Sequence, residues 1–306
     1  MTISPVTTAE LAEVLALLYG PGEDANVGHA FRMVARGELD PDDLLVARRA
    51  GVVIGAVFAS RLPGGVAVIW PPRTIDDEAE VEDALTRAAL AHVHGVRAVQ
   101  AFLPPEEVER AEALVRGGFE HVTRVWQMAE PFAAPRQRSA SRPRGDGVRH
   151  SADASRPTVV PASECVAATV AATLLRAHDD SFDCPELHRA LTPDDVVNGY
   201  LAAAPDQAGW WLALADEAPC GILLMNGPEI TFLGVLPTHR GKGIGRRLLE
   251  AAFDLAPSMS LIVDARNIPA FQLYRSAGFE VVGAREVFLH FPGPAAGITA
   301  TKVSRS

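Results

Sequence analysis

A strand, a glycine-rich turn and a helix follow one another closely in the second half of this 306-residue chain. The stretch "FLGVLPTHRGKGIGRRLLEAA" covers residues 232–252, and Gly241, Gly243 and Gly245 lie between basic residues in it. Glycines remove Cβ atoms, so backbone N–H groups can close on an anion, and the N-terminus of the following helix adds partial positive charge. The stretch therefore predicts an α/β segment with an anion site at the turn.

Two common phosphate-binding motifs do not match this turn. A Walker A loop needs Ser or Thr after its lysine, but Lys242 is followed by Gly243. A dinucleotide fingerprint needs a third glycine where Arg246 stands. A nucleotide-binding P-loop protein is thus disfavoured, while a purely structural turn remains compatible with this stretch alone.

Hydrophobic periodicity and turn residues predict the elements around the turn. Asn226-Gly227 predicts a hairpin, and Gly278 predicts the end of a helix. Strands are expected at 157–162, 209–216, 220–227, 229–237, 260–265, 279–284 and 285–291, and helical segments at 164–180, 185–203, 245–256 and 268–278.

Two motifs in the second half resemble those of the GNAT superfamily of acyl-CoA-dependent N-acyltransferases. Arg240-x-x-Gly243-x-Gly245 is similar to the superfamily signature R/Q-x-x-G-x-G/A. The second motif, N-x-x-A-x-x-L-Y-x-x-x-G-F, is matched in order and distance by Asn267, Ala270, Leu273, Tyr274, Gly278 and Phe279. The resemblance covers residues 158–306 and, more faintly, the first half of the chain.

The resemblance implies an acetyl-CoA site whose glycine turn cradles the pyrophosphate. It also implies that backbone groups of Leu233, Gly234 and Val235 pair with pantetheine and the thioester carbonyl, where an N–H would stabilise the developing oxyanion. The cofactor-binding residues carried over in this way are Leu233, Gly234, Val235, Arg240, Gly241, Lys242, Gly243, Ile244, Gly245, Arg246, Asn267, Ala270 and Tyr274.

Catalytic roles follow from the same resemblance. Tyr274 matches the residue that protonates the leaving thiolate, although an aromatic residue at this position could also be only part of the core. Glu229 has the spacing of the family's strand glutamate, six residues before Val235, and is the favoured base that deprotonates the amine. An exposed turn carboxylate at Glu229, Asp264 as the base, or an ordered water are the alternatives.

The first half of the chain repeats the pattern of the second half. Gly118-Phe119 aligns with Gly278-Phe279 at an offset of 160 residues, which predicts two tandem GNAT domains of α/β class with a mixed sheet (α+β). Upstream, Pro72 aligns with Pro237 at an offset of 165, which places Asp76, Glu78 and Glu80 on the three turn glycines. At the offset of 160, Glu107 takes the place of Asn267 and Leu114 the place of Tyr274. Acidic side chains would repel a pyrophosphate, so the first domain is expected to be degenerate and structural.

The expected domains are 1–130, a degenerate GNAT-like domain, and 158–306, the catalytic GNAT domain. Between them, residues 131–157 hold six arginines and two aspartates with almost no large apolar side chains. Such a composition cannot bury enough surface to order itself, so this stretch is interpreted as a linker.

Composition and charge limit the classes of partner that this protein is expected to bind. A net charge of −10 disfavours nucleic acid, and no segment has the length of apolar sequence needed to span a bilayer. The chain start shows no signal-peptide pattern, and three cysteines without ligand spacing suit a reducing cytoplasm and no metal site. The oligomeric state is left open.

The sequence thus predicts a cytoplasmic N-acetyltransferase that moves acetyl from acetyl-CoA to a primary amine of a small acceptor by direct attack in a ternary complex. An acidic cluster at 179–186 favours a cationic amine, although a solvated helix face would look the same. The alternatives are a catalytically silent acyl-CoA-binding sensor or scaffold and, within the class, a mycothiol-synthase-like enzyme, since that family shares the two-domain plan.

Overall fold

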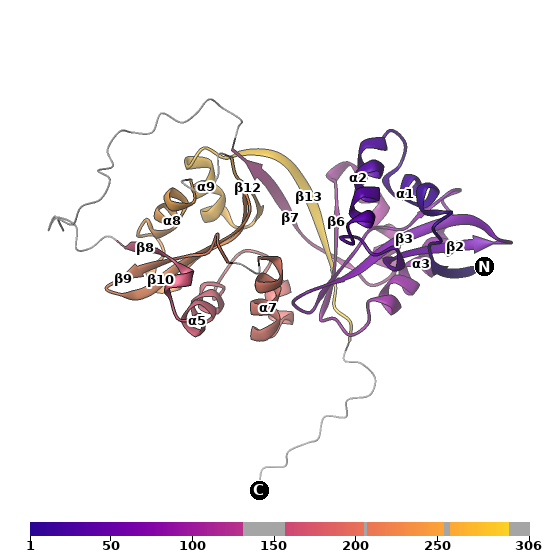
Figure 1. Cartoon of the computed structure of the whole chain (residues 1–306). Coiled ribbons are helices and arrows are strands. Elements are labelled where there is room, and N and C mark those ends of the chain that lie inside the picture. Colours follow the sequence, from indigo (N-terminus) through magenta and orange to yellow (C-terminus); the bar gives the residue numbers. More distant parts are fainter. Residues whose placement is uncertain (131–156, 205–206, 254–257, 294–306) are drawn as a thin grey trace, which may run out of the picture. The chain divides into compact units, whose positions relative to one another are not determined.

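The computed structural model of the chain describes residues 1–130, 157–204, 207–253 and 258–293 (Figure 1). The expected linker lies outside these residues except for Pro157. The chain divides into two compact units, and each is described by itself. Unit 1 comprises residues 1–122, 189–191 and those from 286 onward, and unit 2 comprises residues 123–188 and 192–285.

Unit 1 is an α/β unit with a mixed sheet in the order β1-β2-β3-β4-β6. Strands β4 and β6 are parallel and the other neighbours are antiparallel. Its strands are β1 (Thr2–Pro5), β2 (Leu44–Arg49), β3 (Val52–Leu62), β4 (Val66–Ile69), β5 (Arg73–Thr74) and β6 (Ala98–Leu103). Its helices are α1 (Leu11–Tyr19), α2 (Asp24–Ala35), α3 (Ala79–His92) and α4 (Glu112–Arg116), with 3-10 turns at Pro41–Asp43 and Pro105–Ala111.

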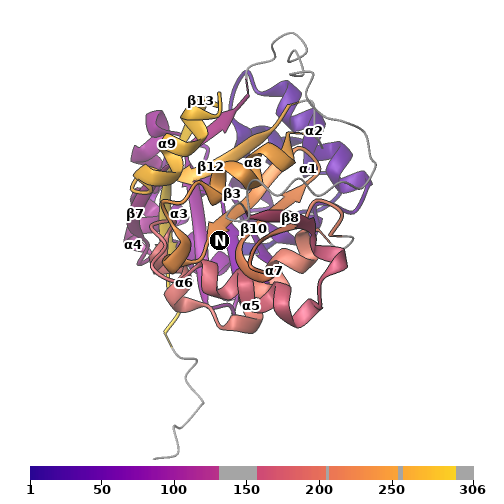
Figure 2. The same ribbon diagram turned by 90° about the vertical axis from the view of Figure 1, so that its left-hand side faces the viewer.

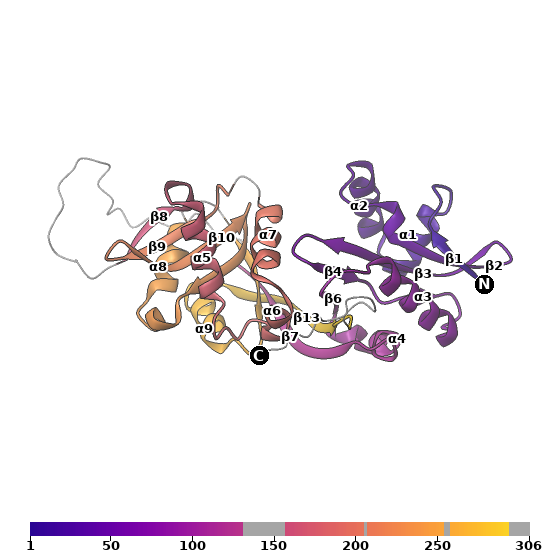
Figure 3. The ribbon, with the colours of Figure 1, turned by 90° about the horizontal axis from the view of Figure 1, so that it is seen from below.

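Both faces of the unit 1 sheet are covered by helices. Successive residues of a strand point to opposite faces. Accordingly, Val57 belongs to the core under α3, whereas Ala56 and Phe58 belong to the core under α1 and α2. Figure 3 shows α1 and α2 on one side of β3 and α3 and α4 on the other.

Unit 2 has the same construction around a sheet in the order β7-β12-β11-β10-β9-β8. Its strands are β7 (Glu120–Ala129), β8 (Thr158–Pro161), β9 (Trp211–Ala215), β10 (Ala218–Asn226), β11 (Glu229–Val235), β12 (Ser260–Asp264) and the first part of β13 (Glu280–His290). Its helices are α5 (Ala167–Ala177), α6 (Pro185–Ala190), α7 (Pro193–Ala203), α8 (Ile244–Ala252) and α9 (Ile268–Ser276), with 3-10 turns at Ala162–Glu164 and Pro237–His239.

Strand β10 is central in unit 2 and is buried on both faces. Leu223 and Met225 pack in the core with α8 and α9, and Ile222 and Leu224 pack in the core with α5. Figure 2 shows α8 and α9 on one side of the strands and α5 and α7 on the other. A continuous apolar run such as "CGILLM" is expected for a strand covered on both faces.

The two units repeat one order of elements, which agrees with the predicted repeat. β2-β3-β4-α3-β6-α4-β7 in the first half corresponds to β9-β10-β11-α8-β12-α9-β13 in the second. The α/β fold class with a mixed sheet is therefore confirmed in both units.

Each sheet is completed by a strand from the other half of the sequence. In unit 2, β7 runs antiparallel to β12, with Val125 opposite Asp264 and Ala129 opposite Ser260. In unit 1, the end of β13 runs antiparallel to β6, with Glu286 opposite Leu103. The compact units therefore cross the sequence boundary expected near residue 130.

One predicted element differs in the structure. Two strands were expected at 279–284 and 285–291, but β13 is a single strand from Glu280 to His290. Its first half lies in unit 2 and its second half in unit 1, so a strand that serves both units has no reason to break between them. The end of α9 before Gly278, which has φ +100°, agrees with the prediction.

Candidate active site

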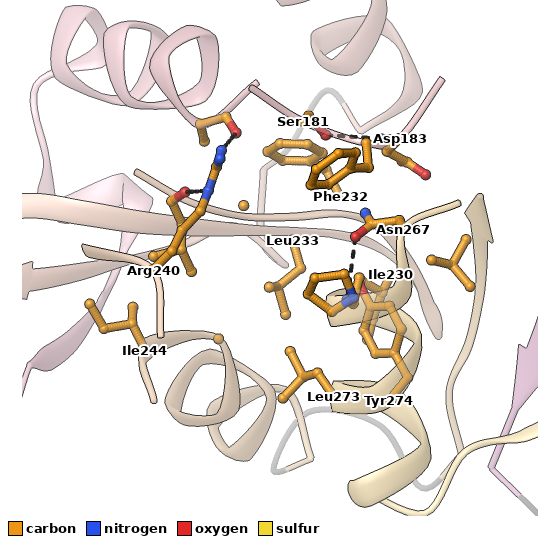
Figure 4. Close-up of a pocket in the computed structure, with 18 of the residues that line it drawn as sticks. Ser181, Asp183, Ile230, Phe232, Leu233, Arg240, Ile244, Asn267, Leu273 and Tyr274 are labelled. Carbon is orange, nitrogen blue, oxygen red and sulfur yellow. Dashed lines mark hydrogen bonds between the residues drawn. The ribbon is translucent and has the colours of Figure 1, made fainter. Parts of the chain in front are cut away.

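A pocket of about 380 Å³ opens in unit 2 where two parallel strands separate (Figure 4). The ladder between β11 and β12 contains Glu229 opposite Ser260 and Ile230 opposite Leu261. β11 pairs with β10 over its whole length, but beyond Ile230 it no longer pairs with β12. The segment from Ile230 to Val235 lines the pocket, together with Ile262 and Val263 of β12.

The glycine turn forms one end of this pocket. Gly241 and Gly243 have φ of +75° and +78°, the left-handed region that L side chains rarely adopt, and an added Cβ on either would meet open space. Gly243 is the N-cap of α8. The turn thus leaves both the backbone and the helix N-terminus open toward the pocket, which is the arrangement that binds anions.

Gly234 and Gly245 are required for a different reason, which is close packing. A Cβ at Gly234 would lie 2.7 Å from the Cβ of Ala177, and one at Gly245 would lie 3.0 Å from a methyl group of Leu273. Both glycines line the pocket. They let α5 and α9 approach β11 and α8, so a side chain at either position would disturb the packing of the pocket walls.

The basic residues of the turn point in different directions. Arg246 is exposed, with 61% of its side chain accessible, and it lines the pocket. Lys242 donates from Nζ to the Thr238 carbonyl at 3.0 Å. Arg240 donates to main-chain carbonyls at the end of α5 (Figure 4). Arg240 and Arg246 both line the pocket, and of the two Arg246 has no main-chain carbonyl among its partners in the described part of the chain but lies 3.9 Å from Glu250.

Helix α9 supplies the opposite wall. Asn267 caps this helix, because its Oδ1 accepts the N–H of Ala270 at 3.3 Å, and both residues line the pocket. Tyr274 lies two turns further along and also lines the pocket, with only 6% of its surface exposed. Its ring packs edge-on against Phe279 at 5.8 Å.

The environment keeps the Tyr274 phenol protonated. Burial raises the pKa of Tyr274 above its usual value of 10.0, and the negative charge of Asp183 raises it further. The hydroxyl is therefore present as the neutral phenol, which is the form that can donate a hydrogen bond or a proton.

The loop between α5 and α6, residues 178–184, forms a further wall, which we call the acceptor loop. Asp180, Ser181, Phe182 and Asp183 line the pocket. Asp183 accepts the N–H of Asp264 on Oδ1 at 3.0 Å, and its own N–H donates to the Ser181 hydroxyl at 3.1 Å. Burial raises the pKa of the Asp183 carboxyl.

Asp264 anchors the acceptor loop. Its side chain is fully buried and accepts bonds from the Thr123 hydroxyl at 2.7 Å and the Cys184 N–H at 3.0 Å. Burial alone would raise its pKa, but these bonds and those from Arg266 outweigh burial and lower the pKa. Arg266 also pairs with Glu186 at 2.8 Å. Both carboxylate oxygens of Asp264 accept hydrogen bonds, and the residue does not line the pocket. A structural role therefore suits Asp264 better than proton transfer.

Glu229 does not lie among the residues that line the pocket. It is exposed at the first position of β11, opposite Asn226 in the hairpin and Ser260 in the parallel ladder. Its neighbour Ile230 is the first pocket residue of the strand. The role of Glu229 as a base therefore stays a prediction.

The corresponding region of unit 1 is built from charged side chains. Glu78 precedes α3 as its N-cap and forms two hydrogen bonds with Arg49, at 3.0 and 2.7 Å. Glu107, which takes the place of Asn267, pairs with Arg73 and Arg110. The first turn of α3 is acidic, so the positive helix end is already compensated within the chain.

Two negative observations apply to the residues that the structure describes. Among them, no three His, Cys, Asp or Glu side chains come together in a way that could hold a metal ion. No helix in the described ranges is both long and apolar enough to cross a membrane.

A splayed parallel strand pair, a glycine turn at a helix N-terminus and a buried tyrosine on the next helix define an acyl-CoA-dependent acyltransferase domain. Comparison of sequences agrees, because residues 149–279 match the acetyltransferase (GNAT) family. Residues 149–279 thus form a domain of the GNAT superfamily.

Two curated relatives are similar to parts of the chain. The peptidyl-lysine N-acetyltransferase YjaB of Salmonella typhimurium is 36% identical over 31% of this chain and 63% of its own length. The mycothiol acetyltransferase of Propionibacterium freudenreichii is 28% identical over 54% of this chain and 53% of its own length. The chain therefore spans less than two thirds of either relative.

The fold of the whole chain also has a counterpart among solved structures. A GCN5-related N-acetyltransferase from Sphaerobacter thermophilus superposes with a TM-score of 0.61 over 96% of both chains, at 16% identity. At this identity the similarity concerns the fold alone, and it extends the α/β architecture over both halves of the sequence.

Sequence reasoning missed three features of this site. It did not foresee that Asp183 lines the pocket beside Tyr274, that Thr123 of β7 bonds Asp264, or that Arg240 turns toward α5. Each depends on a contact between residues 60 or more positions apart, or on the conformation of a loop. The acidic cluster at 179–186 was a signal for the first feature, and the other two left none.

Proposed function

We propose that the second GNAT domain transfers the acetyl group of acetyl-CoA to a primary amine of a small acceptor by direct attack. One observation carries this proposal. A single pocket brings together the glycine turn before α8, the splayed segment of β11 and the buried hydroxyl-bearing residue Tyr274. Anion binding, thioester binding and proton donation would thus be served by one connected site.

The residues of the pocket fit acetyl-CoA. The open turn at Gly241 and Gly243 and the N-terminus of α8 would receive the pyrophosphate, with Arg246 adding positive charge. Gly234 and Gly245 line the part of the pocket between the turn and β11 where the pantetheine arm would lie. Backbone groups of residues 233–235, which lie beyond the ladder with β12, would bind the thioester end.

The transfer balances with two proton movements. The neutral amine attacks the thioester carbonyl carbon, a C–N bond forms, and the carbonyl oxygen takes up negative charge that a backbone N–H of β11 stabilises. Collapse of this intermediate breaks the C–S bond. The leaving thiolate takes the Tyr274 proton, and the proton from the amine passes to the base, for which we propose Glu229 directly or through water. The products are the acetylated amine and the free thiol of coenzyme A.

We further propose that the acceptor is cationic before it reacts. An alkyl ammonium has a pKa of about 10.4, so it arrives charged at neutral pH. Asp183 places a half-buried carboxylate in the pocket wall near Tyr274, and this carboxylate could hold the ammonium close to the thioester. Asp183→Asn should raise the KM for the acceptor while the Kd of acetyl-CoA stays nearly unchanged, and a preferred acceptor that is anionic would contradict this part.

The same experiments also test two alternatives: a more specific acceptor, and acyl-CoA binding without catalysis. The relatives include an enzyme for peptidyl lysine and a mycothiol acetyltransferase, so lysine peptides and the acceptor of mycothiol acetyltransferases belong in any panel of amines. A catalytically inactive sensor would bind acetyl-CoA but would not need Tyr274 as a proton donor.

The test is the release of free thiol from acetyl-CoA in the presence of a library of amines. The proposal expects release that depends on the amine and that Tyr274→Phe strongly reduces. Tight binding of acetyl-CoA without release for any amine in the library would favour the sensor and contradict the enzyme.

A further inference from the structure

Arg240 belongs to the turn motif and lines the pocket, but its guanidinium makes four hydrogen bonds to main-chain carbonyls of unit 2. Nη1 donates to the carbonyl of Asp180 at 3.1 Å. Nη2 donates to the carbonyls of Asp179 at 2.5 Å and Ala177 at 3.4 Å. Nε donates to the carbonyl of Val235 at 3.0 Å. Figure 4 shows the Arg240 side chain with two of these bonds as dashed lines.

These bonds join the end of α5 and the start of the acceptor loop to the end of β11. Helix α5 ends at Ala177, and the final carbonyls of a helix have no partner within it and carry partial negative charge. A planar guanidinium can satisfy several diverging carbonyls at once, which an ammonium cannot do. Arg240 is therefore both the cap of α5 and a tie between α5 and β11.

The acceptor loop depends on this tie. The two carbonyls from Asp179 and Asp180 begin the loop, and Asp180 has φ +53°, a conformation that is strained for a residue with a side chain. Asp180 and the next three residues line the pocket. On the far side, the loop is held by the bonds between Asp183, Cys184 and Asp264. Arg240 thus fixes the near end of the loop and Asp264 fixes its far end.

We propose that Arg240 is a positioning residue for the acceptor loop and does not bind pyrophosphate through its guanidinium. The part of this inference that concerns the acceptor rests on the proposed function, in which the loop faces the amine. The bond from Arg240 to the Val235 carbonyl links the acceptor loop to the end of β11, where the thioester would lie. Phosphate binding is left to the open turn and Arg246.

The experiment compares three variants of the full-length protein. Arg240→Gln removes the charge and the fork of donors, whereas Arg240→Lys keeps the charge and removes the fork. Arg176→Gln is the matched control, because it removes a positive charge from an exposed residue of α5 next to the tie. Amide hydrogen exchange and the Kd of acetyl-CoA are measured for each protein, and neither measurement needs a known acceptor.

The proposal expects Arg240→Gln and Arg240→Lys to behave alike. In both, amides of residues 177–184 should exchange at least about tenfold faster, since two or more hydrogen bonds to charged donors are lost. Exchange in β10 should stay unchanged, and the Kd of acetyl-CoA should change by less than about threefold. Arg176→Gln should match the unaltered protein in both measurements.

Other outcomes would overturn the inference. Near-normal acetyl-CoA affinity in Arg240→Lys with a large loss in Arg240→Gln would show that the charge binds phosphate. Unchanged exchange at 177–184, or equally faster exchange in β10, would show that no local tie exists.

Kinetics with the best amine from the library then test the acceptor role. The KM for that amine should rise about tenfold or more in both Arg240 variants, with a smaller change in kcat. An unchanged KM in both variants would contradict the positioning role. Absence of turnover in the unaltered protein would contradict the proposed function instead, and the exchange result would still decide whether the tie exists.

Discussion

Gly243→Asp tests whether the turn before α8 is the phosphate site. Gly243 has φ +78°, and an added Cβ would meet nothing within 4 Å. An aspartate can therefore be accommodated sterically, and its side chain and negative charge would project into the space where the pyrophosphate is expected. The substitution is designed to weaken acetyl-CoA binding. It also strains the backbone at residue 243, and this effect is measured separately as a loss of stability.

Two free energies determine the expected size of the effect. A left-handed conformation costs a residue with a side chain about 1–2 kcal/mol, which lowers the free energy of unfolding. Loss of one or two charge-assisted hydrogen bonds from the turn costs about 1.5–3 kcal/mol each, or roughly ten- to a hundredfold in affinity per bond. The Kd for acetyl-CoA should thus rise by about a hundredfold, while stability falls only modestly.

Gly95→Asp is the matched control, since Gly95 in unit 1 has φ +87° and equally open surroundings. Titration calorimetry gives the Kd, and thermal unfolding gives the stability loss for both variants. We expect similar stability losses but weaker acetyl-CoA binding only for Gly243→Asp. Unchanged affinity in Gly243→Asp, or an equal loss in Gly95→Asp, would refute the assignment of the turn.

Three further predictions concern proton transfer and pH. Tyr274→Phe keeps the packed ring and should lower kcat by about 10²–10⁴ with little change in acetyl-CoA affinity; full kcat in single-turnover measurements would show that Tyr274 only packs. Glu229→Gln should lower the rate most at low pH, where the amine most needs a base, and an equal effect at every pH would argue against proton transfer by Glu229. Burial, with a contribution from the charge of His178, lowers the pKa of His188 from 6.5 to about 3. Between these pH values His188 is protonated in the unfolded chain but neutral in the folded chain. The resulting stability is fully present above pH 6.5 and falls by up to about 1.4 kcal/mol per pH unit toward pH 3; His188→Asn should flatten this slope in acid unfolding, and an unchanged slope would contradict the reasoning.

The local parts of the fold were predictable from the sequence. The glycine turn, the hairpin at Asn226-Gly227 and the end of α9 at Gly278 follow from backbone conformations that few other residues adopt, and each glycine has positive φ in the structure. The order of strands and helices follows from hydrophobic periodicity, which acts over a few residues. Such signals are contained in short stretches of sequence.

The exchange of β7 and β13 between units could not be predicted in this way. Each strand has the same alternating pattern whichever sheet it completes, so periodicity does not identify its neighbour. The bond between Thr123 and Asp264 joins residues 141 positions apart. Contacts of this kind are set by the packing of the whole unit.

Some residues of the candidate site were predictable from the sequence and others were not. Residues on helix α9 and at the turn fall in the pocket because the regular rise of a helix and the conformation of a glycine turn place them there. Glu229 and Val235 share a spacing that suits one face of a strand, but this spacing does not reveal where β11 leaves β12. The direction of the Arg240 side chain depends on loop carbonyls whose positions no local pattern specifies.

The central claim is that one of the two repeated units has kept an acyl-CoA site. Native mass spectrometry of the full chain tests it most directly, because it counts bound molecules without an acceptor. The acetyl-CoA concentration is set above the Kd of the unaltered protein and below the roughly hundredfold higher Kd expected for Gly243→Asp. We expect one acetyl-CoA per chain, with that single adduct lost in Gly243→Asp. Two molecules per chain, or one molecule that persists in Gly243→Asp, would contradict it.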